Sequence, residues 1–268
     1  MFRSPSQALG VVSLLAALAG TRAMHAQPAN RLDGGRLSIA VVDQPYGLDL
    51  ALLELSRFCA CVIAHEEPEW AWRGDLETVR GARGEHLPVV RRTTLRVTAS
   101  VSDPMTQDDT RRVVTQLVAQ FERQTTARFT IRGDWPLEVV PTQSRAADGS
   151  VRRIVPLIDT PISIAGPPAL PAVWLQRIAA ALAVAARRDV KPVLQGHQVT
   201  FGAVTAFEAR DEPASAVIRR LYGPAQPAAG WSLSYMPFNR SSSLALRTPR
   251  PRHLSVIDPD LRGGAPER

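Results

Sequence analysis

Apolar and polar residues follow one another along the chain in patterns that predict short strands and helices. Leu37–Val42 is an apolar, partly β-branched run and predicts a strand. The next five residues, Asp43–Gly47, combine Asp, Pro and Gly and are typical of a turn. Over Leu48–Cys59, apolar residues recur every three or four positions, which predicts a helix with one buried face.

The rest of the first half predicts a second helix and four more strands. Cys61–Ala64 is a short apolar run, and Thr94–Ala99 alternates as a half-buried strand does. Apolar residues at helical spacing over Val114–Phe121 predict a helix. Two further strands are predicted at Arg128–Arg132 and Leu137–Val140.

The second half repeats this order. Apolar residues at helical spacing predict helices over Trp174–Ala185 and Val217–Leu221. Asp211–Pro213 carries the acids and the proline that are typical of a first helical turn. Strands are predicted at Pro192–Leu194, Val199–Ala209, Trp231–Tyr235 and Leu244–Arg247.

Each half therefore has the order helix, strand, strand, helix, strand, strand. This order predicts an α+β fold of two similar units, with mixed sheets and helices on one face, and an internal duplication explains it most simply. The first unit covers residues 27–143 and the second covers residues 171–248. Residues 144–170 connect them: Asp148-Gly149 predicts a hairpin, and the prolines that follow predict an extended linker.

The N-terminus has the pattern of a cleavable signal peptide over residues 1–26. Arg3 supplies a positive charge, Leu9–Gly20 is an uncharged apolar run, and Ala23 and Ala26 are both suitable last residues of the signal. A membrane anchor is the alternative, but the apolar run ends before the length of about 18 residues that a span needs. We therefore expect a periplasmic or secreted protein with no integral membrane span after cleavage.

Composition and charge exclude several classes of protein. The chain has 268 residues, of which 45% are hydrophobic and 21% charged, so neither wholesale disorder nor a polytopic membrane protein fits. The net charge is +7, but 31 of the 32 basic residues are arginines, which indicates a GC-rich genome. The arginines are scattered and no nucleic-acid motif accompanies them, so no nucleic-acid partner is expected. Residues 249–268 are rich in Pro and Arg and predict a disordered tail.

The two cysteines, Cys59 and Cys61, are separated by one residue. A disulfide across so short a loop stabilises a fold little. Because Cys59 continues the helical stripe and Cys61 opens a strand, two buried thiols are the expected state. A redox pair is the alternative.

Motifs for catalysis are absent from the sequence, which has no Gly-rich phosphate loop, nucleotide-binding fingerprint or nucleophile elbow. His65-Glu66-Glu67 is similar to the start of a zinc-protease motif, but Glu69 stands where the second histidine is needed. We therefore expect no catalytic residue, no cofactor and no metal. The alternative is a secreted hydrolase whose site forms between the two halves, with His65 or His197 as the base.

The connection Ala64–Arg92 is the strongest candidate for a binding site, because so long a connection is uncommon unless it is functional or disordered. It combines acids, tryptophans and an arginine, residue types that are frequent at contact sites. If it binds a partner, its charged residues should be exposed. The alternative is that its tryptophans fold back and complete the core. The predicted partner-binding residues are Glu66, Glu67, Glu69, Trp70, Trp72, Arg73 and Asp75.

Gln44-Pro45, followed by the apolar helical pattern of Leu48–Leu55, resembles the short N-terminal domains of secretins and TonB-dependent receptors. In those domains a strand leads through a Gln-Pro turn into such a helix and then into a short strand. Val217–Leu221, after a long strand, is similar to the second helix of that module, although no secretin core follows. The resemblance implies a small α+β layer that contacts other envelope components. We therefore predict a non-catalytic exported protein that binds an envelope protein or a cell-wall component.

Overall fold

The computed structural model describes residues 30–59, 61–134, 136–193, 205–222 and 230–247. The predicted signal peptide of residues 1–26, the predicted tail of residues 249–268 and the candidate base His197 lie outside these ranges. Leu194 and residues 199–204, which belong to two predicted strands, also lie outside them. None of the helices within the described ranges has the length and apolar character needed to cross a bilayer.

The described part of the chain has the predicted α+β class, with helices packed on mixed sheets. The elements of the first half are β1 (Arg31–Asp33), β2 (Arg36–Gln44), α2 (Gly47–Cys59), β3 (Ile63–Glu66), η1 (Arg73–Asp75), β4 (Leu76–Arg80), β5 (His86–Val90), β6 (Thr93–Ser100), α3 (Gln107–Glu122), β7 (Arg128–Arg132), β8 (Leu137–Arg145) and β9 (Val151–Arg153). Those of the second half are η2 (Leu157–Asp159), β10 (Pro161–Ala169), α4 (Pro171–Ala186), β11 (Asp189–Val193), β12 (Thr205–Pro213), α5 (Ala214–Tyr222), β13 (Gly230–Met236) and β14 (Ser241–Arg247).

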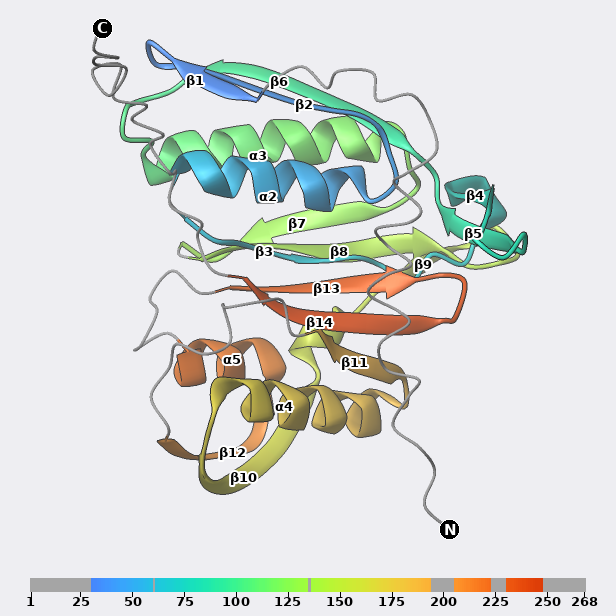
Figure 1. Ribbon diagram of the computed structural model, residues 1–268, viewed down its shortest axis with the longest axis vertical. Coiled ribbons are helices and arrows are strands. Elements are labelled where there is room, and N and C mark those ends of the chain that lie inside the picture. Colours follow the sequence, from blue (N-terminus) through green and yellow to red (C-terminus); the bar gives the residue numbers. More distant parts are fainter. Residues whose placement is uncertain (1–29, 60, 135, 194–204, 223–229, 248–268) are drawn as a thin grey trace, which may run out of the picture.

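A central sheet with the strand order β11-β14-β13-β3-β8-β7 runs through both halves, and β9 pairs with β8 beside it. Figure 1 shows α2 and α3 between this sheet and the smaller sheet β1-β2-β6. On the other side, α4 and α5 lie between the central sheet and the pair β10-β12. The helices are therefore enclosed between sheets in both halves.

The two halves have the same strand pairing. In the first half β2 pairs antiparallel with β6, and β8 lies between the parallel strand β3 and the antiparallel strand β7. In the second half β10 pairs antiparallel with β12, and β14 lies between the parallel strand β11 and the antiparallel strand β13. Apart from β1, β9 and the hairpin β4–β5, which the first half adds, each half thus contributes one two-stranded pair and one three-stranded part of the central sheet.

The halves join where β3 pairs in parallel with β13, in the register His65 with Ser232 and Glu66 with Leu233. Neighbouring residues of β3 point to opposite faces of the sheet. Ile63 accordingly packs in the core formed with α2 and α3, whereas Ala64 packs in the core formed with α4 and α5. One short strand therefore serves both hydrophobic cores.

The proline-rich segment after residue 160 is a strand and not the predicted linker. Residues 161–169 form β10, and Ile162 and Ile164 are buried against the second core. Its prolines lie where a ladder tolerates a missing N–H: Pro161 opens the strand, and the later pair Pro167-Pro168 falls at a shift of register between Gly166 and Ala169. The second unit therefore begins before residue 171.

The segment Asp211–Pro213 also differs from its prediction. It forms the end of β12, where Glu212 pairs with Ile162 and Pro213 with Pro161, and α5 begins only at Ala214. Pairing with β10 supplies the backbone partners that a first helical turn would have lacked. The acids therefore extend a strand and do not cap a helix.

Cys59 and Cys61 form a disulfide, so the expectation of two free thiols is wrong. Cys59 is the last residue of α2 and Cys61 lies two residues before β3, and their Cα atoms are 5.0 Å apart, within the range that a disulfide bridges. The bond lies at the end of the helix that packs beside β3.

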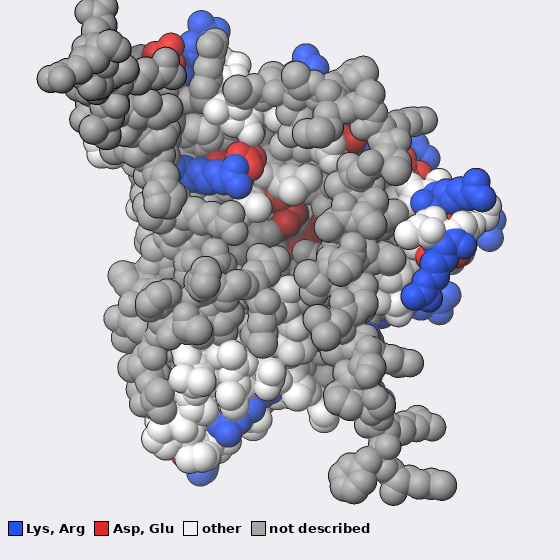
Figure 2. Space-filling view, in the orientation of Figure 1, with Lys and Arg blue, Asp and Glu red and all other residues white. Residues whose placement is uncertain are grey.

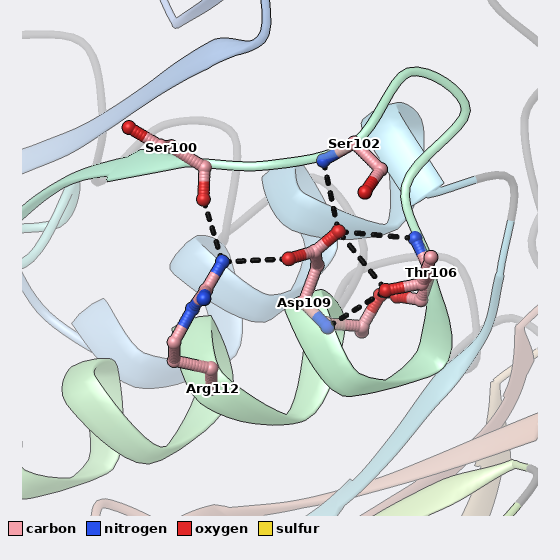
Figure 3. Close-up of polar contacts among 6 residues, drawn as sticks. Ser100, Ser102, Thr106, Asp109 and Arg112 are labelled. Atoms are coloured by element: carbon pink, nitrogen blue, oxygen red, sulfur yellow. Dashed lines mark hydrogen bonds and ion pairs between the residues drawn. The ribbon is translucent and has the colours of Figure 1, made fainter.

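The start of α3 is set by a capping box (Figure 3). The Thr106 hydroxyl accepts the N–H of Asp109 at 3.1 Å, and the Asp109 carboxylate accepts the N–H groups of Thr106 at 3.3 Å and Ser102 at 2.9 Å. These donors, the Ser102 N–H foremost, lower the pKa of Asp109 to about 2. Arg112 donates to the other carboxylate oxygen at 2.6 Å and to the Ser100 carbonyl. The cluster thus joins the loop after β6 to the helix and is a structural cap.

Gly230 tests the junction of the halves, because a Cβ there would overlap Cγ1 of Val62 and lie 3.3 Å from its Cβ. We expect Gly230→Ala to lower the free energy of unfolding by about 1–3 kcal/mol. Gly166→Ala is the control: the atoms nearest to its Cβ would be the guanidinium end of Arg177, a flexible side-chain terminus that can shift, so a change within about 0.5 kcal/mol is expected. Urea unfolding measures both.

A further substitution tests whether the loss of stability in Gly230→Ala comes from the overlap with Val62. In the Gly230→Ala background, Val62→Ala should cost less than it does alone, because it also removes the overlap. Equal stability of the Gly230→Ala and Gly166→Ala variants would contradict the described junction.

Candidate functional site

The segment Ala64–Arg92 consists of ordered elements and is not one open loop. It contains most of β3, then η1, and then the antiparallel hairpin β4–β5, which Figure 1 shows at one side of the molecule near β9. The predicted contact residues divide into an interior and an exposed group. Glu66, Glu67, Trp70 and Asp75 are buried, Glu69 and Trp72 are half-buried, and Arg73 is exposed. The expectation that the charged residues are exposed is wrong for the three buried acids.

Glu66 is held by the backbone of the second half. Its two carboxylate oxygens accept the N–H groups of Leu157 at 2.6 Å and Ile158 at 3.0 Å, at the start of η2. Complete burial raises the pKa of Glu66 to about 7, against the lowering effect of these two N–H donors. Because both oxygens accept hydrogen bonds from the second half, the buried Glu66 side chain links the two halves.

Glu67 continues the same contact one residue further along. Its N–H donates to the carbonyl of Leu233 at 2.9 Å, and its carboxylate accepts the N–H of Tyr235 at 3.2 Å. Burial, and the charge of Glu67 after it, raise the pKa of Tyr46 well above its ordinary value. Glu67 therefore extends the pairing of β3 with β13 through its side chain.

Trp70 and Asp75 complete the first core. Trp70 is 3% exposed and its ring meets that of Phe121 edge-on, with centroids 6.2 Å apart. The Asp75 carboxylate accepts the N–H of Thr126 at 3.0 Å and also its hydroxyl. The alternative prediction, that a tryptophan of this segment folds back and completes the core, is therefore confirmed for Trp70.

A further polar contact joins His65 on β3 to Asp49 on α2. Nδ1 of His65 lies 3.1 Å from Oδ1 of Asp49, and the His65 side chain is 1% exposed. Its Nε2 has no hydrogen-bond partner among the described residues. An imidazole oriented by a carboxylate can act as a base, but only on a substrate that reaches Nε2. In this conformation the surrounding core separates that atom from solvent.

Arg132 connects acids from both halves. Its Nε donates to Glu138 at 2.8 Å, and its terminal nitrogens make a two-point contact with Asp159 on η2. These contacts, first that with Asp159, raise the pKa of Arg132. Arg219 on α5 approaches the same Glu138 at 3.7 Å. This network is a second link between the halves.

The exposed group gathers arginines from distant segments. Oε2 of Glu69 lies 3.1 Å from a terminal nitrogen of Arg152 on β9 and 2.9 Å from one of Arg188, which follows α4. The guanidinium of Arg145, at the end of β8, lies 5.2 Å from the ring centroid of Trp72 and stacks on it. Glu69 and Trp72 therefore position three arginines on the surface.

The β4–β5 hairpin adds arginines of its own. Arg80 and Arg83 are exposed near its tip, and Arg73 and Arg91 are exposed at its base. In Figure 2, blue side chains gather on the part of the molecule where Figure 1 shows this hairpin. We call the set the arginine surface; it comprises Arg73, Arg80, Arg83, Arg91, Arg145, Arg152 and Arg188.

This arrangement can bind anionic groups by charge and by bidentate hydrogen bonds from guanidinium. One half-buried carboxylate, that of Glu69, lies among the arginines of β8, β9 and α4. Groups of three or more His, Cys, Asp or Glu side chains suited to a metal ion do not occur in the described ranges.

Of the arginine surface, the sequence predicted only Arg73, together with Glu69 and Trp72, which position other members; the remaining six arginines were missed. For Arg80 and Arg83 a signal was present, because Arg-Gly-Ala-Arg-Gly over residues 80–84 places arginines around a glycine turn. No local pattern predicts that Arg188 contacts Glu69, because the two residues are 119 positions apart in the sequence.

Comparison of the chain with protein-family models, with curated proteins and with solved structures finds no match in any of the three. The resemblance to the N-terminal domains of secretins and TonB-dependent receptors therefore rests on the residues quoted above. It stays a proposal.

Glu66 predicts a pH dependence of stability. Its pKa is about 7 in the folded protein and 4.5 ordinarily, so the folded protein binds this proton more tightly than the unfolded chain does. The resulting stabilisation, about 3 kcal/mol, is complete below pH 4.5, falls as the pH rises towards 7 and is absent above it. Glu66→Gln cannot titrate, so the wild type should lose more stability than this variant between pH 5 and pH 8.

Urea unfolding of the two proteins at both pH values makes the comparison. Glu208→Gln, at an exposed position of β12, is the control and should keep the pH dependence of the wild type. An identical pH dependence in Glu66→Gln and the wild type would refute the assignment.

Proposed function

We propose that the protein is an exported, non-catalytic binding module that contacts a component of the cell envelope through its arginine surface. The observation that carries this proposal is the exposure of Arg73, Arg80, Arg83 and Arg91 on a projecting hairpin and at its base. The half-buried Arg145 and Arg152 lie on the strands β8 and β9 beside it. Charged and aromatic residues held in place on a surface without a core function are typical of contact sites.

Export is supported by two features. Arg3, the apolar run Leu9–Gly20 and the small residues at Ala23 and Ala26 have the order of a signal peptide. The disulfide between the two cysteines fits an oxidising compartment such as the periplasm or the extracellular space.

The shared topology of the halves supports two related proposals. One is that the chain arose by duplication of a single helix-and-strand unit. The other is kinship with the N-terminal domains of secretins and TonB-dependent receptors, since β2, the turn at Gln44-Pro45, α2 and the short β3 follow in the order those domains have. Both favour a contact module in the envelope.

The alternative function is a secreted hydrolase with a site between the halves. The pair of His65 with Asp49 at the junction is the observation that favours it. The burial of His65 counts against it, because a general base must reach its substrate.

A photo-crosslinking residue, p-benzoylphenylalanine, in place of Ala82 at the hairpin tip tests the contact surface. In the exported protein mixed with envelope membranes, it should give discrete adducts that mass spectrometry identifies as protein, glycan or lipid. The same residue at Leu170, which is 55% exposed at the start of α4 and lies at the opposite end of this helix from Arg188, should give few. Equal yields at both positions, or none at the hairpin, would refute the proposed surface.

Export is tested by expressing the full chain in a bacterial host. N-terminal sequencing of the soluble envelope fraction should find a chain that begins at residue 24 or 27. Alkylation of its two cysteines should require prior reduction, because the disulfide blocks both thiols. An intact N-terminus in the cytoplasm would contradict the proposal.

A further inference from the structure

The arginine surface holds more positive charge than its own acids neutralise. Arg73, Arg80, Arg83 and Arg91 are exposed, and none of the ion pairs found among the described residues includes their guanidinium groups. Glu85, in the hairpin turn, accepts the backbone N–H of Arg83 at 2.9 Å. Arg92 differs, since it contacts Glu77 at 3.2 Å. The unpaired guanidinium groups are therefore available to an anionic partner.

These charges are spread out and do not converge on one point. β4 has five residues, which at about 3.3 Å each makes a strand of roughly 16 Å between η1 and the hairpin turn. Arg73 and Arg80 lie at opposite ends of that length. On the other side of η1, Trp72 positions Arg145. Such spacing fits a partner with many anionic groups on an extended surface better than a single small anion.

The half-buried apolar side chains of the hairpin lie on the face opposite Arg80. Val79 and Leu87 face each other across β4 and β5, one residue before and after the pair Arg80 and His86, and both are half-buried. Because neighbouring residues of a strand point to opposite faces, Arg80 and His86 share one face of the hairpin and Val79 and Leu87 share the other. The contact of the arginines with an anionic partner therefore rests on charge.

We propose that the arginine surface binds the phosphate headgroups of an anionic lipid bilayer, with the β4–β5 hairpin making the first contact. This inference rests on the proposed function and names the partner of the same surface. Each arginine near such a membrane strengthens binding by a factor of about 5. An exported chain meets lipid surfaces and not nucleic acid, which is the other partner that clustered arginines suit.

The experiment is co-sedimentation of the exported protein with vesicles of phosphatidylglycerol and phosphatidylcholine, compared with vesicles of phosphatidylcholine alone. The wild type should bind only the anionic vesicles, and about 500 mM NaCl should release it, because salt screens exposed charges. The double variant Arg80→Ala, Arg83→Ala should bind roughly 30-fold more weakly.

A second double variant, Arg36→Ala with Arg57→Ala, is the matched control. Arg36 pairs with Ser100, seven residues along β6 from Thr93, which puts it about 23 Å from the strand end that follows the hairpin. Arg57 lies in the last turn of α2, the helix whose first residue, Gly47, adjoins Thr93. This variant loses the same charge and should keep the affinity of the wild type.

Circular dichroism verifies that both variants fold. Failure of the wild type to prefer anionic vesicles, equal losses in the two double variants, or tighter binding to a DNA duplex than to the vesicles would each overturn the inference. If vesicle binding fails but the crosslinker at Ala82 still gives protein or glycan adducts, the lipid inference falls and the proposed function stands.

Discussion

The parallel pairing of β3 with β13 is the contact on which the rest of the structure depends, because it makes one sheet from two halves. It places Ile63 and Ala64 in different cores and carries Glu66 and Glu67 into the interior. Buried carboxylates are costly unless hydrogen bonds replace their water. Here the backbone N–H groups of Leu157, Ile158 and Tyr235 replace it, so these acids hold the correct register and disfavour any other.

The same pairing raises the question of why the sheet stops at six strands in line. β7 occupies in the first half the place that β13 occupies in the second, yet no described strand pairs with its outer edge. The N–H of Phe129 on β7 donates to the Glu122 side chain at 2.7 Å instead. At the other end, β11 contains Pro192, a residue that strands tolerate at a sheet edge. Both ends thus have features that natural sheets use to prevent further pairing.

Residues 66–72 supply both buried hydrogen bonds between the halves and part of the arginine surface's surroundings. Glu66 and Glu67 lie inside, whereas Glu69, only two residues later, reaches Arg152 and Arg188 at the surface. Trp70 then returns to the core and Trp72 to the surface. Because buried residues alternate with surface residues here, Glu69 and Trp72 are anchored beside the junction of the halves and hold Arg152, Arg188 and Arg145 near it.

Sequence alone was enough for the features that depend on near neighbours. The helices over Gly47–Cys59 and Pro171–Ala186 follow from apolar residues at helical spacing, and the hairpin at Asp148-Gly149 follows from turn chemistry. The extended strand Thr93–Ser100 follows from alternation. In each case the interactions that select the conformation lie within a few residues, so the local sequence pattern is enough to predict the element.

Tertiary structure alone decided which polar residues are interior and which prolines belong to a strand. The donors that make burial of Glu66 and Glu67 tolerable lie 91 and 168 residues away along the chain. Pro161–Ala169 is a strand because β12, more than 30 residues later, pairs with it. The arginines around Glu69 likewise come from β9 and from the end of α4. A local pattern cannot predict these outcomes, since the free energy that selects each one comes from a partner that only the folded chain brings near.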